Sequence, residues 1–187
     1  MPVDSEADVS ESTADTSQQR TTAMPIRIRI PAIGIDQPLT SLRVQQDGHL
    51  AAPSEPEQIG WWSDGPRPGN PGATVIVGHV DSTTGPAAFY NLSTLHPGDK
   101  VTLLRKDRST ISFTIRALRQ YEKDAFPDSQ VYATSGPPAL HLITCSGAYD
   151  RGRGEYQDNL VVYATLTSAA SASPSRAARH PAARSAD

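Results

Sequence analysis

The sequence predicts an all-β domain, either a small barrel or a sandwich, with about seven or eight short strands and at most two short helices. Two observations support this prediction. Apolar residues gather in short runs that either alternate with polar residues or are apolar throughout, which is the pattern of strands. Sixteen prolines and thirteen glycines separate these runs, and a chain so rich in turn residues is not typical of a helical bundle.

The first strands can be placed from their patterns. Pro25–Pro31 alternates isoleucine with arginine, which predicts a half-buried strand, and Ile33–Pro38 continues in the same style. A short strand at Leu42–Val44 precedes a turn at Asp47-Gly48. The segment Ala51–Gly72 is dense in proline and glycine and is predicted to be a long ordered loop.

Ala73–Val80 is apolar at almost every position, which predicts a central strand buried on both faces. Pro86–Leu92 predicts a short helix with proline in its first turn. Two strands follow, Lys100–Leu104 and Thr110–Tyr121, and the residues between them form a hairpin loop.

The last strands flank a polar segment. Ala139–Thr144 predicts a strand that stops at Cys145. The polar residues Ser146–Asp158 are predicted to be a loop, and Leu160–Thr165 is predicted to be the final strand.

The chain of 187 residues divides into one folded domain and two polar tails. Residues 1–23 are acidic and rich in Ser, Thr and Gln, whereas residues 167–187 are mostly Ala, Ser, Pro and Arg. Neither composition buries enough apolar surface to offset the entropy of ordering, so both tails are expected to be disordered. Residues 24–166 are long enough to form one core.

The charge and hydropathy patterns exclude two classes of function. The formal net charge is −3 and no basic stripe is present, so the sequence does not indicate a nucleic-acid binder. No run approaches the ~18 apolar residues of a membrane span, and no signal-peptide pattern opens the chain. We therefore expect a soluble protein.

Two predicted strand ends carry reactive side chains. His79 lies at the end of the central strand, and Cys145, the single cysteine, lies where another strand ends. A thiol reacts as its thiolate, which a neighbouring imidazole can generate or stabilise. Acyl transfer also needs a donor for the oxyanion, and Arg151 and Arg153 in the following loop are candidates. Each residue taken singly is more often structural, but the combination at strand ends indicates a cysteine nucleophile.

Several separated segments resemble the sortase family. Leu142–Cys145 resembles its Thr-Leu-x-Thr-Cys signature, with His141-Leu142 where Thr-Leu is usual, and Val77–Val80 resembles its histidine motif. The resemblance spans nearly all of residues 25–166 and is strongest to the class F sortases of actinobacteria. The segments that carry this second resemblance are Ile30–Ile35, Gly60–Trp62, Gly78–Ser82, Gly85–Tyr90 and Tyr156–Ala164.

The resemblance implies an eight-stranded sortase barrel that acts as a cysteine transpeptidase. Cys145 would attack the Thr–Gly bond of a Leu-Pro-x-Thr-Gly-like sorting signal to form a thioacyl intermediate. His79 would protonate the leaving amine and then deprotonate the incoming amine of a cell-wall precursor, while Thr144 would contact the substrate. The resemblance also implies the extracellular face of the membrane or the cell wall. We expect a monomer with no cofactor and no metal ion.

The chain departs from the family pattern at the arginine that holds the substrate and the oxyanion. Better-known sortases place it at the start of the last strand, where this chain has Asp158 and Asn159. We therefore expect the arginine to come from the preceding loop. Arg151 is favoured as the catalytic arginine because Asp150 can anchor it, whereas Arg153, a second substrate contact, lies between two flexible glycines. A membrane-anchoring helix, usual in sortases, is a second feature that the sequence lacks.

Three alternatives remain open from the sequence. His79, Asp81, Cys145 and His141 offer the ligand types that zinc accepts, although His141 and Cys145 would lie about 13 Å apart along a strand. An L,D-transpeptidase would also use cysteine and histidine, but that family expects Ser-x-Gly-Cys, and here Ile-Thr precedes the cysteine. A non-catalytic barrel would keep the fold without the activity.

Overall fold

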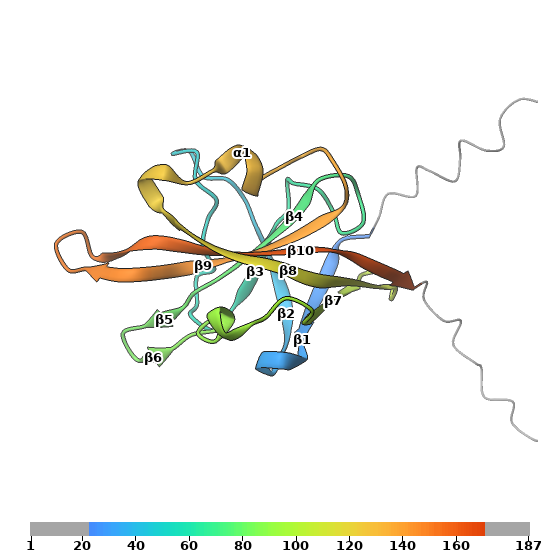
Figure 1. Ribbon diagram of the computed structural model, residues 1–187, viewed down its shortest axis with the longest axis horizontal. Coiled ribbons are helices and arrows are strands. Elements are labelled where there is room, and N and C mark those ends of the chain that lie inside the picture. The colour runs from blue at the N-terminus through green and yellow to red at the C-terminus, as the bar shows by residue number, and fades with distance from the viewer. Residues whose placement is uncertain (1–22, 171–187) are drawn as a thin grey trace, which may run out of the picture.

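The structure, a computed structural model, describes residues 23–170, and the predicted tails lie outside the described residues apart from their innermost positions. Eight strands close into a barrel in the order β1-β2-β3-β4-β9-β10-β8-β7, and β5 and β6 form a separate two-stranded sheet (Figure 1). The predicted all-β barrel is therefore confirmed. No helix among residues 23–170 is long and apolar enough to cross a membrane.

The strands are short in the first half of the chain and longer in the second. They are β1 (Pro25–Ile30), β2 (Ile35–Leu42), β3 (Ile59–Trp62), β4 (Ala73–Gly78), β5 (Asp81–Ser82), β6 (Gly85–Pro86), β7 (Lys100–Arg105), β8 (Thr110–Glu122), β9 (Ala139–Asp150) and β10 (Glu155–Ala170). The helical pieces are η1 (Pro31–Ile33), η2 (Leu92–Thr94), η3 (Lys123–Ala125) and α1 (Asp128–Val131).

The sheet is mixed and contains two parallel pairs of strands, which flank the antiparallel pair β3–β4. β2 pairs parallel with β3, and β4 pairs parallel with β9, whereas the other neighbours are antiparallel. The antiparallel pairing of β1 with β7 closes the barrel. As a result β4 lies between β3 and β9, which is the central position that its apolar sequence predicts.

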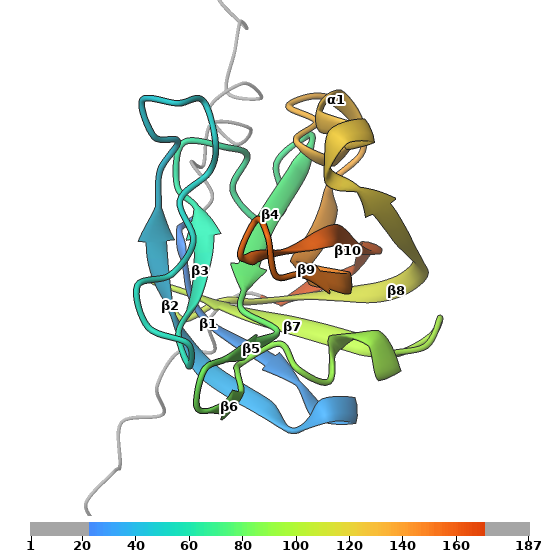
Figure 2. The same cartoon turned by 90° about the vertical axis from the view of Figure 1, so that its left-hand side faces the viewer.

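Two apolar clusters stabilise the barrel. The larger fills the interior with side chains from almost every barrel strand, including Ile28, Ile76, Leu103 and Leu142. The smaller lies on the outer face of β4, β9 and β10, where Val131 of α1 covers the sheet (Figure 2). Strand β4 contributes Ile76 to the first cluster and Val75 to the second, so it is buried on both faces.

Four predicted elements are wrong. The predicted strand Leu42–Val44 is absent, because β2 ends at Leu42 and Val44 forms only an isolated bridge with Leu50. The predicted loop Ala51–Gly72 contains β3. This strand has only four residues, which do not alternate between apolar and polar, and its pairing with β2 and β4 sets its register. The predicted helix Pro86–Leu92 is absent because the amides of Ala87 and Phe89 donate to the carbonyls of Val80 and His79 instead of forming helical bonds. Only the short η2 follows.

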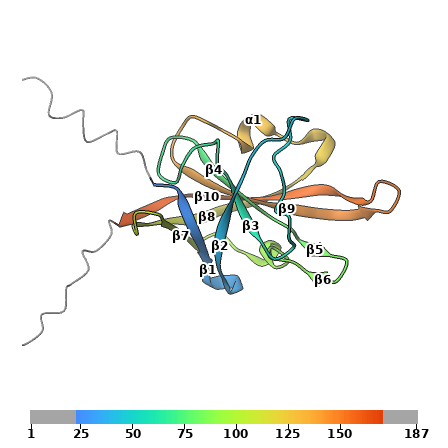
Figure 3. The same ribbon diagram turned by 180° about the vertical axis from the view of Figure 1, so that it is seen from behind.

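The predicted polar loop Ser146–Asp158 is the fourth error. β9 continues to Asp150 and β10 begins at Glu155, so the segment is a long hairpin with its turn at residues 151–154. The hairpin projects beyond the barrel wall (Figures 1 and 3). At its other end β10 continues to Ala170, past the predicted strand end at Thr165. Polar residues form this ladder because both faces of the hairpin are largely exposed.

Gly78 ends β4 against the buried ring of Phe89. A Cβ atom added at Gly78 would lie 2.7 Å from Cδ2 of that ring, and Phe89 is fully buried. We expect Gly78→Ala to lower the free energy of unfolding by about 1–3 kcal/mol because the ring cannot move freely. Urea denaturation measures the change, and Phe89→Leu in the same chain should recover part of it.

Gly152→Ala is the matched control for this substitution. Its Cβ would meet only the carboxylate of Asp150, at 3.2 Å, in an exposed turn. We expect a change within about 0.5 kcal/mol. Equal stability of the Gly78→Ala and wild-type proteins would contradict the packing described.

Candidate active site

The parallel pairing of β4 and β9 sets the positions of His79 and Cys145. The ladder runs from Ala73 opposite Ala139 to Val77 opposite Ile143. His79 is two residues after Val77, and Cys145 is two residues after Ile143. The two residues therefore lie at the same level along neighbouring parallel strands. Adjacent strands lie about 4.8 Å apart, and residues two apart point to the same face. Cys145 therefore shares the outer face on which Ile143 lies, and His79 follows directly after the end of β4 at Gly78.

The Cys145 thiol is half-buried among charged neighbours. Burial raises the pKa of this thiol above its ordinary value. The charge of Lys123 lowers the same pKa, whereas Asp81 and Glu155 raise it. With burial as the largest cause, the thiol stays protonated near neutral pH, and a base is needed to form the nucleophile.

One nitrogen of the His79 ring is fixed by the loop before β3. Nε2 lies 2.8 Å from the carbonyl oxygen of Pro53, a buried residue. A carbonyl only accepts, so Nε2 carries the proton and Nδ1 is the nitrogen that can take up another. The ring is held by the backbone while one nitrogen stays available for proton transfer.

Asp81 connects this region to the hairpin. The hydroxyl of Tyr156 on β10 donates a hydrogen bond to Oδ2 of Asp81, and this bond raises the pKa of Tyr156 to about 12. The rings of Tyr156 and Tyr149 pack edge to face with centroids 5.2 Å apart. A cavity of about 380 Å³ lies between β5 and this pair of rings. Sequence reasoning missed this contact because Asp81 and Tyr156 are far apart in the chain.

A groove with both apolar and charged walls lies on the other side of the hairpin, and the charged residues Lys123, Asp128 and Glu155 are part of its lining. It has a volume of about 390 Å³, and Val77, Ile143 and Asn159 line it from three adjacent strands. Phe126 and Tyr132, from the connection between β8 and β9, form its far wall. Val77 and Ile143 are two residues before His79 and Cys145, so the groove lies close to both strand ends that carry the candidate residues.

The structure does not bring either predicted arginine to Cys145. Arg151 lies at the exposed tip of the hairpin and forms no hydrogen bond or ion pair with another residue of the described segment. Six steps of extended strand separate it from Cys145, which is roughly 20 Å and exceeds the length of an arginine side chain.

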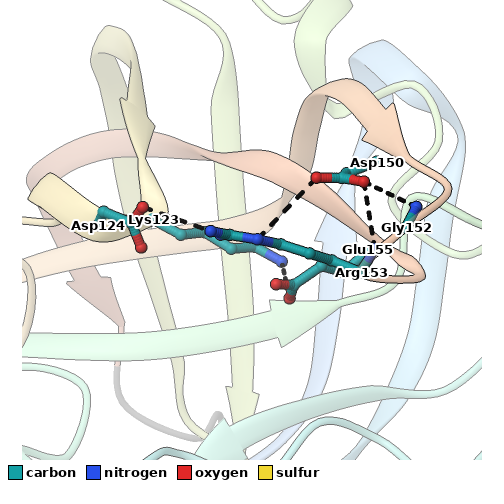
Figure 4. A network of polar contacts seen from close by, with 6 residues as sticks. All are labelled: Lys123, Asp124, Asp150, Gly152, Arg153 and Glu155. Carbon is teal, nitrogen blue, oxygen red and sulfur yellow. Dashed lines mark hydrogen bonds and ion pairs between the residues drawn. The ribbon is translucent and has the colours of Figure 1, made fainter.

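Arg153 is the better anchored of the two arginines. Its guanidinium lies 3.9 Å from the Asp150 carboxylate and 3.8 Å from that of Asp124, while Lys123 pairs with Glu155 at 3.1 Å (Figure 4). Oδ1 of Asp150 also accepts the backbone N–H of Arg153. The anchoring argument from the sequence was therefore wrong, because Asp150 holds Arg153 and not Arg151.

Thr144 and His141 are both buried. Thr144 is 3% exposed, and by strand alternation it points to the barrel interior, on the opposite face from Cys145. Nδ1 of His141 donates to the carbonyl oxygen of Val131 at 2.7 Å, and burial lowers the pKa of this histidine. His141 thus tethers α1 to the sheet. Within residues 23–170 no three His, Cys, Asp or Glu side chains gather as metal ligands.

Asn159 is the polar residue that sequence reasoning left without a role. It is the direct partner of Cys145 in the β9–β10 ladder. The only sequence signal was its place at the start of the last strand. The pairing register, which sequence patterns do not reveal, is what places it opposite the thiol.

Comparisons with known proteins fit this architecture. The sequence matches the Sortase domain family over residues 28–167. No curated protein matches the chain closely enough in sequence to count as a relative.

Solved structures with the same barrel include several sortases. Sortase A of Listeria monocytogenes is 15% identical, with 80% of this chain and 90% of that chain covered and a TM-score of 0.58. Sortase C-1 of Actinomyces oris is 22% identical, with 77% and 75% covered and a TM-score of 0.57. The pilus-related sortase C of Group B Streptococcus is 18% identical, with 88% and 77% covered and a TM-score of 0.59. The family match over most of the chain, on a barrel shared with these proteins, shows that the chain belongs to the sortase family.

Proposed function

We propose that this cell-envelope cysteine transpeptidase cleaves a Leu-Pro-x-Thr-Gly-like sorting signal between Thr and Gly and transfers the acyl group to a cell-wall amine. The observation that supports the proposal is the parallel pair Val77–Ile143, from which His79 and Cys145 are each two residues away, together with the groove that these two paired residues line. The proposal includes action as a monomer on the extracellular face of the membrane, and membership of class F, to which the segments around Gly60–Trp62 and Tyr156–Ala164 are similar.

The reaction needs two proton transfers through His79. Nδ1 takes the proton of the Cys145 thiol, the thiolate adds to the Thr carbonyl, and the C–N bond to Gly breaks as His79 returns the proton to the leaving amine. The incoming amine then gives a proton to His79 and attacks the thioester. The C–S bond breaks, and the thiolate recovers that proton.

The groove offers a surface for the signal peptide. Leu50, Phe126 and Tyr132 supply apolar area, while Val77 and Ile143 form the floor that leads to the thiol. A Leu-Pro pair of a peptide bound with its Thr carbonyl at Cys145 would lie against these side chains. The cavity beside Asp81 lies on the opposite side of the hairpin. An amine can therefore approach the thioester through this cavity while the acyl chain stays bound in the groove.

The role of Arg151 stays a prediction. Arg151 lies at the tip of the hairpin, so its side chain can contact the acyl group only if the turn at residues 151–154 folds back over the groove. The L,D-transpeptidase alternative loses its support because the family match is to sortases.

Cys145→Ala should abolish peptide cleavage and leave the thermal transition nearly unchanged, since the thiol is only half-buried. Incubation with a Leu-Pro-x-Thr-Gly peptide library and amine acceptors, followed by mass spectrometry, measures cleavage and transfer. A variant that unfolds several degrees earlier but still cleaves would show that Cys145 is only a packing residue. Intact peptides with the wild-type protein would favour the non-catalytic barrel.

Charge changes around the thiol should shift its ionisation in opposite directions. Asp81→Asn removes a charge that raises the pKa of Cys145, so its midpoint should move to lower pH; Lys123→Met should move it to higher pH. The pH dependence of alkylation by iodoacetamide measures the midpoint. Shifts of the same sign in both variants would contradict the assignment of these neighbours.

A further inference from the structure

The acyl-transfer steps require a hydrogen-bond donor for the oxygen of the attacked carbonyl, which becomes an oxyanion. The donor must lie on the face where Cys145 projects and within one side-chain length of Sγ. Neither hairpin arginine meets this condition in the structure, because Arg151 lies at the exposed tip of the hairpin and the guanidinium of Arg153 faces the carboxylates of Asp124 and Asp150.

We propose that the side-chain amide of Asn159 donates this hydrogen bond, a role that rests on the proposed acyl transfer at Cys145. Directly opposed residues of an antiparallel ladder point to the same face, with Cβ atoms about 4.5–5.5 Å apart. Asn159 and Cys145 are such a pair. The amide therefore lies beside the atom to which the acyl group is attached.

The groove supports the same placement by an independent observation. Asn159 lines the groove together with Ile143 and Val77, the residues that precede the reactive pair on the same face. Val161, two residues further along β10, packs against Ile143 in the outer cluster. The side chain of Asn159 thus projects toward the bound peptide and not into the barrel.

The chemistry of an amide suits this position. Its NH2 group has two donors, and the side chain of Asn159 forms no hydrogen bond within residues 23–170, so both donors are available. Asp81 and Glu155 already place negative charge near the thiol. A neutral donor stabilises the developing oxyanion without forming an ion pair with these carboxylates.

Lys123 is the other candidate donor near the thiol, since its charge lowers the pKa of Cys145. Its Nζ, however, lies 3.1 Å from Glu155 in an ion pair at the groove wall. The pairing leaves it less suited than a free amide. Lys123 shifts the ionisation of the thiol, and Asn159 contacts the acyl oxygen.

The test compares two reactions of the same thiol. Attack on a peptide carbonyl forms an oxyanion, whereas alkylation by iodoacetamide does not. Asn159→Ala should lower kcat for peptide cleavage by about 100- to 1000-fold with KM nearly unchanged, and should leave the alkylation rate at each pH as in the wild-type protein. Asn159→Asp keeps the shape but loses the donors, so it should be impaired at least as strongly.

Asn91→Ala is the control, because Asn91 is exposed beside η2 and its side chain caps nothing. Equal losses in cleavage and alkylation would mean that Asn159 only positions the thiol, which would overturn the proposal. Normal turnover of Asn159→Ala, with Arg151→Ala or Lys123→Met as the impaired variant, would also overturn it. If the wild-type protein forms no acyl-enzyme with any peptide, the proposed function itself fails, and that result is separate from a loss confined to Asn159 variants.

Discussion

The parallel pairing of β4 with β9 is the constraint on which the site depends. Two parallel strands end in the same direction, so residues that follow equivalent positions meet at one edge of the barrel. His79 and Cys145 are 66 positions apart in the chain, yet the pair Val77–Ile143 fixes them to the same level. The closed barrel holds this register because both strands are buried on two faces, by the interior cluster and by the α1 side.

The β9–β10 hairpin divides the surroundings of the thiol into two environments. One side carries the groove lined by Val77, Ile143 and Asn159, and the other carries the contact between Tyr156 and Asp81. This division suits the proposed reaction, in which an acyl donor and an amine bind in succession. It also explains the mixed electrostatics of Cys145, whose charged neighbours come from β5, η3 and β10.

Local patterns predicted the fold where side chains alternate or are uniformly apolar. β1, β4, β7 and β8 follow such runs closely. Sequence patterns did not predict β3 or the β9–β10 hairpin, because hydrogen bonding to neighbouring strands determines the conformation of these segments. The strand-end positions were enough to select Cys145 and His79 as candidates. They were not enough to find Asn159 or the anchors of Arg153, because register and distant contacts such as Asp124 appear only in the folded chain.

The proposed reaction requires that His79 and Cys145 are neighbours. An NMR titration of the His79 ring signals tests it most directly, because ionisation of an adjacent thiol changes the environment of the imidazole. We expect the His79 ring signals of the wild-type protein to shift at the pH at which the Cys145 thiol ionises. That shift should be lost in Cys145→Ala. Identical curves for the two proteins would show that the two side chains do not meet.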